Sequence, residues 1–367
     1  MAINRIFARS PYIVEINQPT QTGSKVELYI YQSGTPAPVS PSYTLEKLIP
    51  ASNNTQTLYN ISPYLMEYIE HNTFVNNYST DSGLLSVSEY ILVDVKTYWL
   101  DPFTQSYVAL STATYYGFDG FGLYSQGFNP THGQAMPVHL DEQNYYFWSD
   151  ANNTPISNQL QRGGTFVAWL ETGWEVKYTQ LQTGLTYSYT IASNDYYNLY
   201  RVYPSYYLTG NIVEIFTPMA VLSWTSTFNP IEECKYDVQV VDFVNMYGAW
   251  QREFFFKASF ENLEVTTTEF NLMQEGSVPF WSYNELLNQR QTFNTNGTIG
   301  YRVNTGWVDE TFNNNLQQLM LSERILLNNM PVKLKTKSVE KQKNINNKMI
   351  NYVLEFEQSN DLINNVI

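Results

Sequence analysis

The residue types that perform catalysis or bind metals are sparse in this sequence and show no spacing typical of an active site. A metal site needs several His, Cys or carboxylate groups that converge on one point. Only His132 and His139 are close in sequence, so a metal or acid–base pair there is the alternative to two ordinary hydrogen-bonding histidines. We interpret the single cysteine as a small buried hydrophobic residue. The histidines and the cysteine are His71, His132, His139 and Cys234.

Motifs for phosphate binding and for nucleophilic hydrolysis are also missing from the sequence. There is no Gly-x-Ser-x-Gly elbow and no phosphate loop, and the Gly-Phe-Gly stretch at 120–122 lacks the lysine that such a loop needs. A glycosidase holds two carboxylates a few ångströms apart, but the spacing of Asp119, Asp141, Glu171 and Glu175 singles out no pair. We therefore predict no catalytic residue, no cofactor and no metal, and we expect that the protein is not an enzyme.

The composition favours a globular protein built mainly from β-sheet. Aromatic residues make up 16% of the chain and charged residues 15%, against a typical charged fraction of about 25%. Aromatic and β-branched side chains fit the half-buried surface of a pleated sheet, and Asn, Gly and Ser supply turns. At roughly 150 residues per domain, 367 residues indicate two or three domains.

The charge and hydropathy of the chain bear on its partners and its location. The formal net charge is -14, whereas nucleic-acid-binding proteins usually carry a basic surface, so we predict no specific nucleic-acid binding. No stretch approaches the roughly 18 consecutive apolar residues of a membrane span, and the first residues lack the apolar core of a signal peptide. We expect no membrane association and a protein that is made and folded in a cytoplasm.

Alternating apolar and polar residues predict two tandem β-sandwich domains of immunoglobulin or fibronectin type, at 1–118 and 119–228. In the first domain, for example, Val26 and Leu28 fall on one face of a strand. A glycine-rich stretch at 117–122 marks the boundary. The expected strands are 12–16, 25–31, 43–49, 90–100, 106–116, 166–170, 174–178, 186–191 and 211–217. A short helix is expected at 61–69.

A third, β-rich domain is predicted at 229–357. It is expected to contain a hairpin between 236–240 and 252–257, and a tight turn at Asn296-Gly297, which suits the positive φ angles of a type I′ hairpin. An apolar stripe predicts one amphipathic helix at 309–327; its members are Phe312, Leu316, Leu319 and Met320, with Glu323 at its end. A last hairpin joins 332–339 to 349–357, and residues 358–367 form a C-terminal arm.

Lysines gather in this last hairpin, and Glu340 is the one acid among them. They are interpreted in two ways: as residues that protect a solvated edge strand, or as a basic surface that meets an acidic surface on the next subunit. Opposite patches on like subunits pair head to tail and close into rings, and tryptophans are enriched at such interfaces. The candidate inter-subunit contacts are Lys333, Lys335, Lys337, Lys341, Lys343, Lys348 and Trp250.

Both ends of the chain carry a resemblance to virion proteins of phages that infect Bacteroidetes. The similar segments are 10–13, 28–31, 61–64, 234–257, 321–325, 331–338 and 346–357. The setting that they resemble is the crAss-like phages, which have short tails with stacked protein rings. The middle segment shows no such resemblance.

The resemblance implies a structural protein of the virion tail: a homo-oligomeric ring, hub or collar that joins other tail, portal or fibre proteins and encloses the DNA channel. The alternative is a receptor-binding or fibre-attachment protein that recognises host surface glycan. That alternative predicts an exposed aromatic groove in the middle domain, built from residues such as Trp169, Trp174 and Tyr178. An enzyme that degrades polysaccharide is a third hypothesis, and no carboxylate pair supports it.

Overall fold

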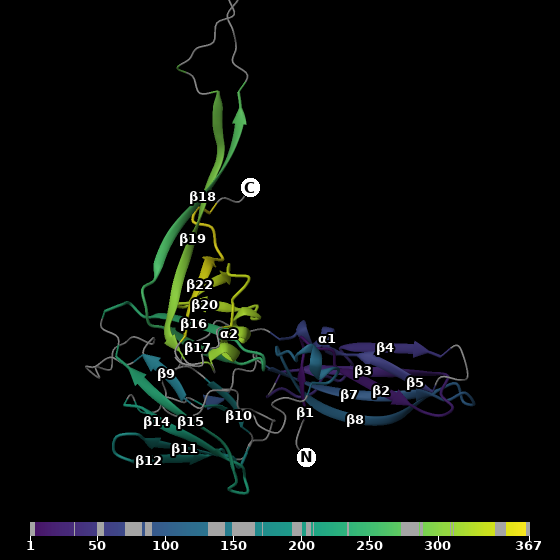
Figure 1. The fold of residues 1–367 in the computed structure, drawn as a ribbon. Helices are drawn as coiled ribbons and strands as arrows, with labels where there is room; N and C mark the ends of the chain where they lie inside the picture. Colours follow the sequence, from purple (N-terminus) through teal and green to yellow (C-terminus); the bar gives the residue numbers. More distant parts are fainter. Residues whose placement is uncertain are drawn as a thin grey trace, which may run out of the picture.

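The computed structural model confirms that the chain is mainly β, with the strands of its described residues arranged in several sheets and two α-helices packed against them (Figure 1). The immunoglobulin or fibronectin type of these sheets stays a prediction. The structure describes residues 4–32, 34–49, 55–69, 83–84, 90–130, 144–148, 166–170, 172–192, 200–202, 207, 209–232, 235–272, 286, 289–308, 310, 312–341 and 350–364.

The first part of the chain forms a sandwich-like body in which a small sheet and a helix cover a larger sheet. The larger sheet has the order β1 (Asn4–Phe7), β8 (Tyr107–Phe118), β7 (Tyr90–Leu100), β3 (Gly23–Tyr31) and β4 (Tyr43–Leu48). The cover consists of β2 (Ile13–Asn17), β5 (Gln56–Asn60) and α1 (Ser62–Met66). Val26 and Leu28 are fully buried in the core between them, together with Leu65 of α1. The predicted apolar face of this strand is therefore confirmed.

The middle part contains two further sheets. One has the order β12 (Thr186–Thr190), β11 (Glu175–Gln180), β14 (Asn211–Phe216), β15 (Leu222–Ile231) and β9 (Asn144–Trp148). The other contains β10 (Phe166–Leu170), β13 (Tyr200–Val202) and β6 (Gly83–Leu84). A short 3₁₀ helix, Tyr124–Gln126, lies between the first and middle parts in sequence. Strand β15 continues without a break across position 228, where the third domain was expected to begin.

The last part is a seven-stranded sheet that carries the features most relevant to function. Its order is β17 (Trp250–Phe255), β16 (Gln239–Val244), β20 (Ile325–Leu327), β21 (Met330–Leu334), β22 (Ile350–Gln358), β19 (Arg290–Val308) and β18 (Phe260–Asn271). Helix α2 (Phe312–Met320) packs on this sheet through Phe312, Leu316 and Leu319. The two predicted hairpins are confirmed by the antiparallel pairs β16–β17 and β21–β22.

The prediction of one long helix at 309–327 is wrong at its C-terminal end. Helix α2 ends at Met320, and Ile325–Leu327 form β20, which pairs with β16 on one side and β21 on the other. The apolar stripe of the helix ends at Glu323, and the three consecutive apolar residues that follow Arg324 are buried in the sheet instead. The Asn328 and Asn329 backbones then have φ of 50° and 66°, which makes the tight turn to β21.

The predicted turn at Asn296-Gly297 is also wrong. Both residues lie inside the 19-residue strand β19, where Asn296 pairs with Thr266 and Gly297 with Val265 of β18. The glycine is used for close packing instead of for a turn. A Cβ atom at Gly297 would lie 3.2 Å from side-chain atoms of both Leu263 and Leu362, so a larger residue would push the C-terminal segment away.

The hairpin β16–β17 joins the three parts of the molecule. Its side chains alternate between two cores, because successive residues of a strand point to opposite faces. Val240 and Phe254 pack into the core of the middle part, whereas Val241 and Phe255 pack against α2 and the strands beside it. Its turn contributes Tyr247 and Ala249 to a core shared with the first part of the chain, with Phe7, Tyr90 and Phe118.

A buried ion pair lies across this hairpin. Asp242 and Arg252 are cross-strand partners, and the guanidinium binds the carboxylate through two hydrogen bonds, Nε–Oδ1 at 2.7 Å and Nη2–Oδ2 at 2.8 Å. Their side chains are 0% and 1% exposed. Burial raises the pKa of Asp242, and Arg252 opposes that rise. The hydroxyl of Tyr145 donates to the carbonyl oxygen of Arg252, so this pair also lies where the middle part meets the hairpin.

The opposite face of the hairpin holds a buried carboxyl group. Gln251 Nε2 and Asn315 Nδ2 donate to Oε1 of Glu253 at 2.7 and 2.9 Å. Burial raises the pKa of Glu253 from 4.5 to about 8, and the two amide donors reduce the rise only in part. Since Asn315 belongs to α2, this polar contact fixes the helix on the sheet.

Removing one member of the ion pair is expected to destabilise the protein more than replacing both. Arg252→Met leaves the Asp242 carboxylate buried without its partner, which costs about 3–5 kcal/mol in comparable cases. In Asp242→Leu/Arg252→Met neither charge remains, so the free energy of unfolding from denaturant titration should recover a large part of that loss. A double variant less stable than Arg252→Met would contradict this role for the pair.

Glu253 is expected to make stability depend on pH. Between the unfolded pKa of 4.5 and the folded pKa of about 8, the folded protein holds a proton that the unfolded chain releases. The free energy of unfolding should therefore fall as pH rises through this window, by up to about 1.4 kcal/mol per pH unit. Glu253→Gln keeps an amide oxygen for both donors and should remove this slope. An unchanged slope in chemical denaturation series from pH 5 to pH 8 would exclude Glu253 as its source.

Candidate assembly interface

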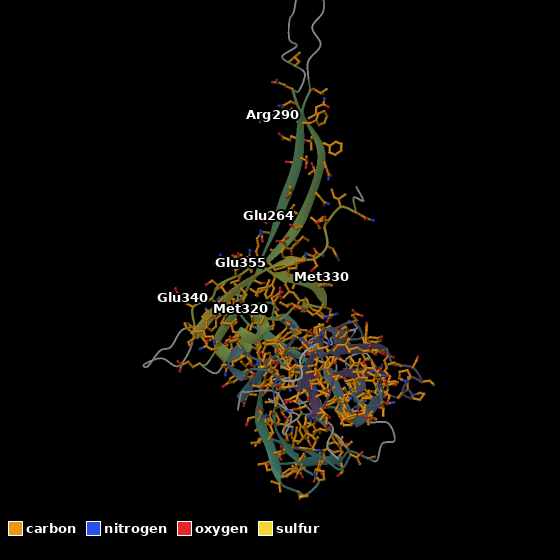
Figure 2. The ribbon with its side chains drawn as sticks, turned by 90° about the vertical axis from the view of Figure 1, so that its right-hand side faces the viewer. Glu264, Arg290, Met320, Met330, Glu340 and Glu355 are labelled. Carbon is orange, nitrogen blue, oxygen red and sulfur yellow. The ribbon has the colours of Figure 1, made fainter. Side chains whose placement is uncertain are left out.

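A two-stranded ribbon extends from the seven-stranded sheet and projects away from the other described strands (Figure 1). We define the ribbon as β18 with residues 290–299 of β19, the part of β19 that β22 does not pair. Every residue of β18 is exposed. Figure 2 shows Glu355 at the base of the ribbon, Glu264 along it and Arg290 toward its far end. The ribbon therefore offers two faces and one long strand edge to other molecules.

Large apolar side chains lie on this ribbon without a core to cover them. Phe260 is 64% exposed and Phe293 is 67% exposed, and Leu263, Val265 and Phe270 are also exposed. Phe293 is the extra residue of a bulge opposite Thr268 and Glu269, and its ring meets that of Phe270 edge to face. Exposed apolar surface of this kind on a projecting element is typical of a protein–protein contact.

The sequence analysis did not identify β18. The tight turn assigned to Asn296-Gly297 placed a chain reversal where β19 runs straight, which left no partner for the segment before it. The signal that favours a strand is present, because Val265, Thr266, Thr267 and Thr268 are four consecutive β-branched residues.

Strand β18 carries negative charge and no positive charge. Its three charged residues are Glu261, Glu264 and Glu269. Glu264 Oε2 lies 2.6 Å from the ammonium of Lys335, which lowers the pKa of Glu264, and the carboxylate in turn raises the pKa of Lys335. Glu261 and Glu269 form no ion pair with any residue that the structure describes. The ribbon thus presents acidic and apolar side chains together.

Fewer lysines form an exposed basic surface than the sequence predicted. Lys335 is held between Glu264 and Glu357 of its own chain. Lys333, Lys337 and Lys341 are exposed, and Lys341 donates to Oε1 of Gln317 at 2.5 Å. We call these three residues the lysine surface. Two further predicted contacts, Lys343 and Lys348, lie outside the described residues.

The interpretation of this hairpin as a protected edge is wrong for β21, because that strand pairs with β20 on one side and β22 on the other. The edges of the sheet are β17 and β18. Beside the lysine surface lies an open hollow of about 390 Å³, lined by Lys333 and Lys337 and by apolar residues that include Met320, Val332 and Leu334. The lysines therefore border a surface depression instead of a strand edge.

Trp250, a further candidate contact, faces the interior of its own chain. It is 4% exposed and packs against Val244 and Leu326. Its place in the fully buried strand β17 explains this position. Composition alone did not distinguish a tryptophan in a core from one at an interface.

The C-terminal segment covers part of the second strand of the ribbon. The amide of Leu362 donates to the carbonyl of Gly297 at 2.8 Å. The side chain of Asn296 accepts from the amide of Ile363 and donates to its carbonyl, each at 3.0 Å. The described part of the predicted C-terminal arm is thus bound along β19, whereas no described strand pairs with the outer edge of β18.

The residues considered for chemistry do not form a site in the part of the chain that the structure describes. No group of three or more His, Cys, Asp or Glu is placed there to hold a metal. Asp119 is buried, and Arg324 lies 3.9 Å from it. Tyr178 is fully buried, and Trp174 is partly buried against the same core, so Tyr178 does not contribute to an exposed aromatic groove. His71, His132, His139, Asp141, Glu171, Cys234 and the side chain of Trp169 lie outside the described residues.

Comparison of the chain with protein-family models and with curated proteins found no match. Among the described residues, none of the helices combines the length and the apolar character needed to cross a membrane.

Asn296 is expected to hold the C-terminal segment on the ribbon. Asn296→Ala removes the hydrogen bonds to Ile363, and each typically contributes about 0.5–1.5 kcal/mol. Because two such bonds are lost, hydrogen exchange at the Leu362 and Ile363 amides should become about fivefold faster or more, and exchange in β16 should stay unchanged. Thr298→Ala on the same strand is the matched control. Equal exchange in both variants would show that Asn296 does not hold the segment.

Proposed function

We propose that this chain is a structural, non-enzymatic subunit that assembles with copies of itself, as a component of a bacteriophage tail. The observation that carries the proposal is the ribbon, a long element that is exposed along β18 and bears uncovered apolar side chains beside carboxylates. An isolated two-stranded hairpin is at best marginally stable in water. A ribbon of this kind therefore gains stability from contact with another chain.

The setting in a phage particle rests on the resemblance of both ends of the chain to virion proteins of crAss-like phages. In that setting the chain would form a ring, hub or collar of the tail, made in the cytoplasm of the host bacterium and enclosing the DNA channel. The acidic charge of the chain suits such a channel, because a wall that repels phosphates lets DNA pass. Other tail, portal or fibre proteins would bind the completed ring.

A mass measurement on the purified full chain tests the self-assembly. Mass photometry across a range of concentrations should show one closed oligomer of fixed copy number, and antibody labelling of phage particles should place the chain at the tail. A chain that stays monomeric at every concentration would contradict the assembly. Labelling of the capsid alone would contradict the place in the tail.

A further inference from the structure

We propose that the ribbon of one copy binds the lysine surface of the next copy, so that copies join head to tail. This inference rests on the proposed self-assembly and specifies the interface that carries it. The contact would place Glu261 and Glu269 of the ribbon against Lys333 and Lys337 of the neighbour. Exposed apolar side chains of the ribbon would fill the hollow beside these lysines.

The open edge of β18 is the first support for this contact. The chain covers one side of the ribbon with its own C-terminal segment at Asn296 and Gly297, but no described strand pairs with the outer side of β18. Twelve residues of extended strand span about 40 Å at about 3.4 Å per residue. An edge of this length with unpaired backbone groups binds other chains readily.

The negative charge of β18 favours a cationic partner over a second ribbon. Two copies of β18 paired with each other would bring six carboxylates together, because each strand carries Glu261, Glu264 and Glu269 and no Lys or Arg. Like charges on facing strands are destabilising. Pairing between two ribbons is therefore disfavoured, and a cationic surface is the better partner.

The same chain supplies that cationic surface, the lysine surface, near the base of the ribbon. Figure 2 shows Glu264 and Arg290 along the ribbon, and Met320 and Glu340 below it. Met320 lines the hollow together with Lys333 and Lys337. Within one copy, Glu264 of the ribbon binds Lys335 of this lysine-rich stretch. The exposed lysines Lys333, Lys337 and Lys341 remain for another copy.

The hollow beside the lysines matches the ribbon in chemistry. Its lining combines the ammonium groups of Lys333 and Lys337 with apolar Val332 and Leu334, and β18 carries apolar Leu263 and Val265 between the carboxylates of Glu261 and Glu269. The acid that also lines the hollow, Glu323, is bound at 2.9 Å by Arg9. The hollow is therefore suited to apolar and acidic side chains of a second chain.

Two complementary patches that face different directions on one chain produce a heterologous contact, which closes into a ring or continues as a filament. Because the opposed charges are exposed at the rim, the contact should weaken as salt is raised. Self-assembly alone does not specify these contacts, in which acidic residues of one copy meet lysines of the next.

The test uses two charge-reversed full-length chains. The ribbon variant is Glu261→Lys/Glu269→Lys, which leaves the internal Glu264–Lys335 pair intact, and the surface variant is Lys333→Glu/Lys337→Glu. Each variant alone should raise the concentration for half-assembly by about tenfold or more in mass photometry. Circular dichroism and thermal unfolding should match the wild type. Glu15→Lys/Glu46→Lys makes the same change in net charge on exposed acids of the first part and should assemble normally.

Mixing the two variants gives the decisive result. In each variant the ribbon and the lysine surface carry net charge of the same sign. A ribbon from either variant therefore fits only the surface of the other, and the mixture should assemble where neither does alone. Variants that assemble like the wild type, or a mixture that fails to assemble, would overturn this interface and leave the proposed function standing. A wild type that never assembles would instead overturn the proposed function itself.

Discussion

Burial of the β16–β17 hairpin on both faces and at its turn is the constraint on which the rest of the structure depends. Alternation along the strands sends Val240 and Phe254 into one core and Val241 and Phe255 into another. The turn packs on the first part of the chain, where a Cβ at Gly248 would lie 2.9 Å from the backbone of Asp119. Full burial of the Arg252 guanidinium and the Asp242 carboxylate here is stable only because the two groups bind each other. The three parts are therefore connected by packed side chains as well as by the chain itself.

Burial of the hairpin covers one edge of the seven-stranded sheet and leaves the other edge exposed. One edge, β17, is completely buried, whereas the other, β18, is completely exposed. Directly after β17, the amide of Lys257 donates to the carbonyl of Asn304 in β19 at 3.3 Å, so the chain enters the ribbon from a fixed point. A fixed base and a projecting, uncovered edge are what a subunit needs to place a contact on its neighbour. They are the physical basis for the assembly that we propose.

The sequence predicted most of the strands, because alternation at positions such as Val26 and Leu28 follows directly from burial of one face of a sheet. It did not predict secondary structure that depends on contacts between residues far apart in the sequence. Ile325–Leu327 lie inside the segment predicted as a helix, yet pairing with strands on both sides makes them β20. Asn296-Gly297 has the composition of a turn, yet pairing with Thr266 and Val265 of β18 keeps it in a strand. For the candidate interface, the sequence showed the cluster of lysines. It did not show that Trp250 is buried or that Lys335 binds Glu264 and Glu357 of its own chain, because both depend on contacts between residues far apart in the sequence.

Zero-length carbodiimide coupling in a mixture of ¹⁴N- and ¹⁵N-labelled wild-type chains tests the central claim most directly, because it joins only carboxylates and amines that touch. Glu264 and Lys335 should couple within single copies, which serves as the internal control. Our account predicts additional products in which Glu261 or Glu269 of one isotope is joined to Lys333 or Lys337 of the other. Efficient coupling of the control pair in the assembled oligomer, with no mixed-isotope product between the ribbon and the lysine surface, would contradict it.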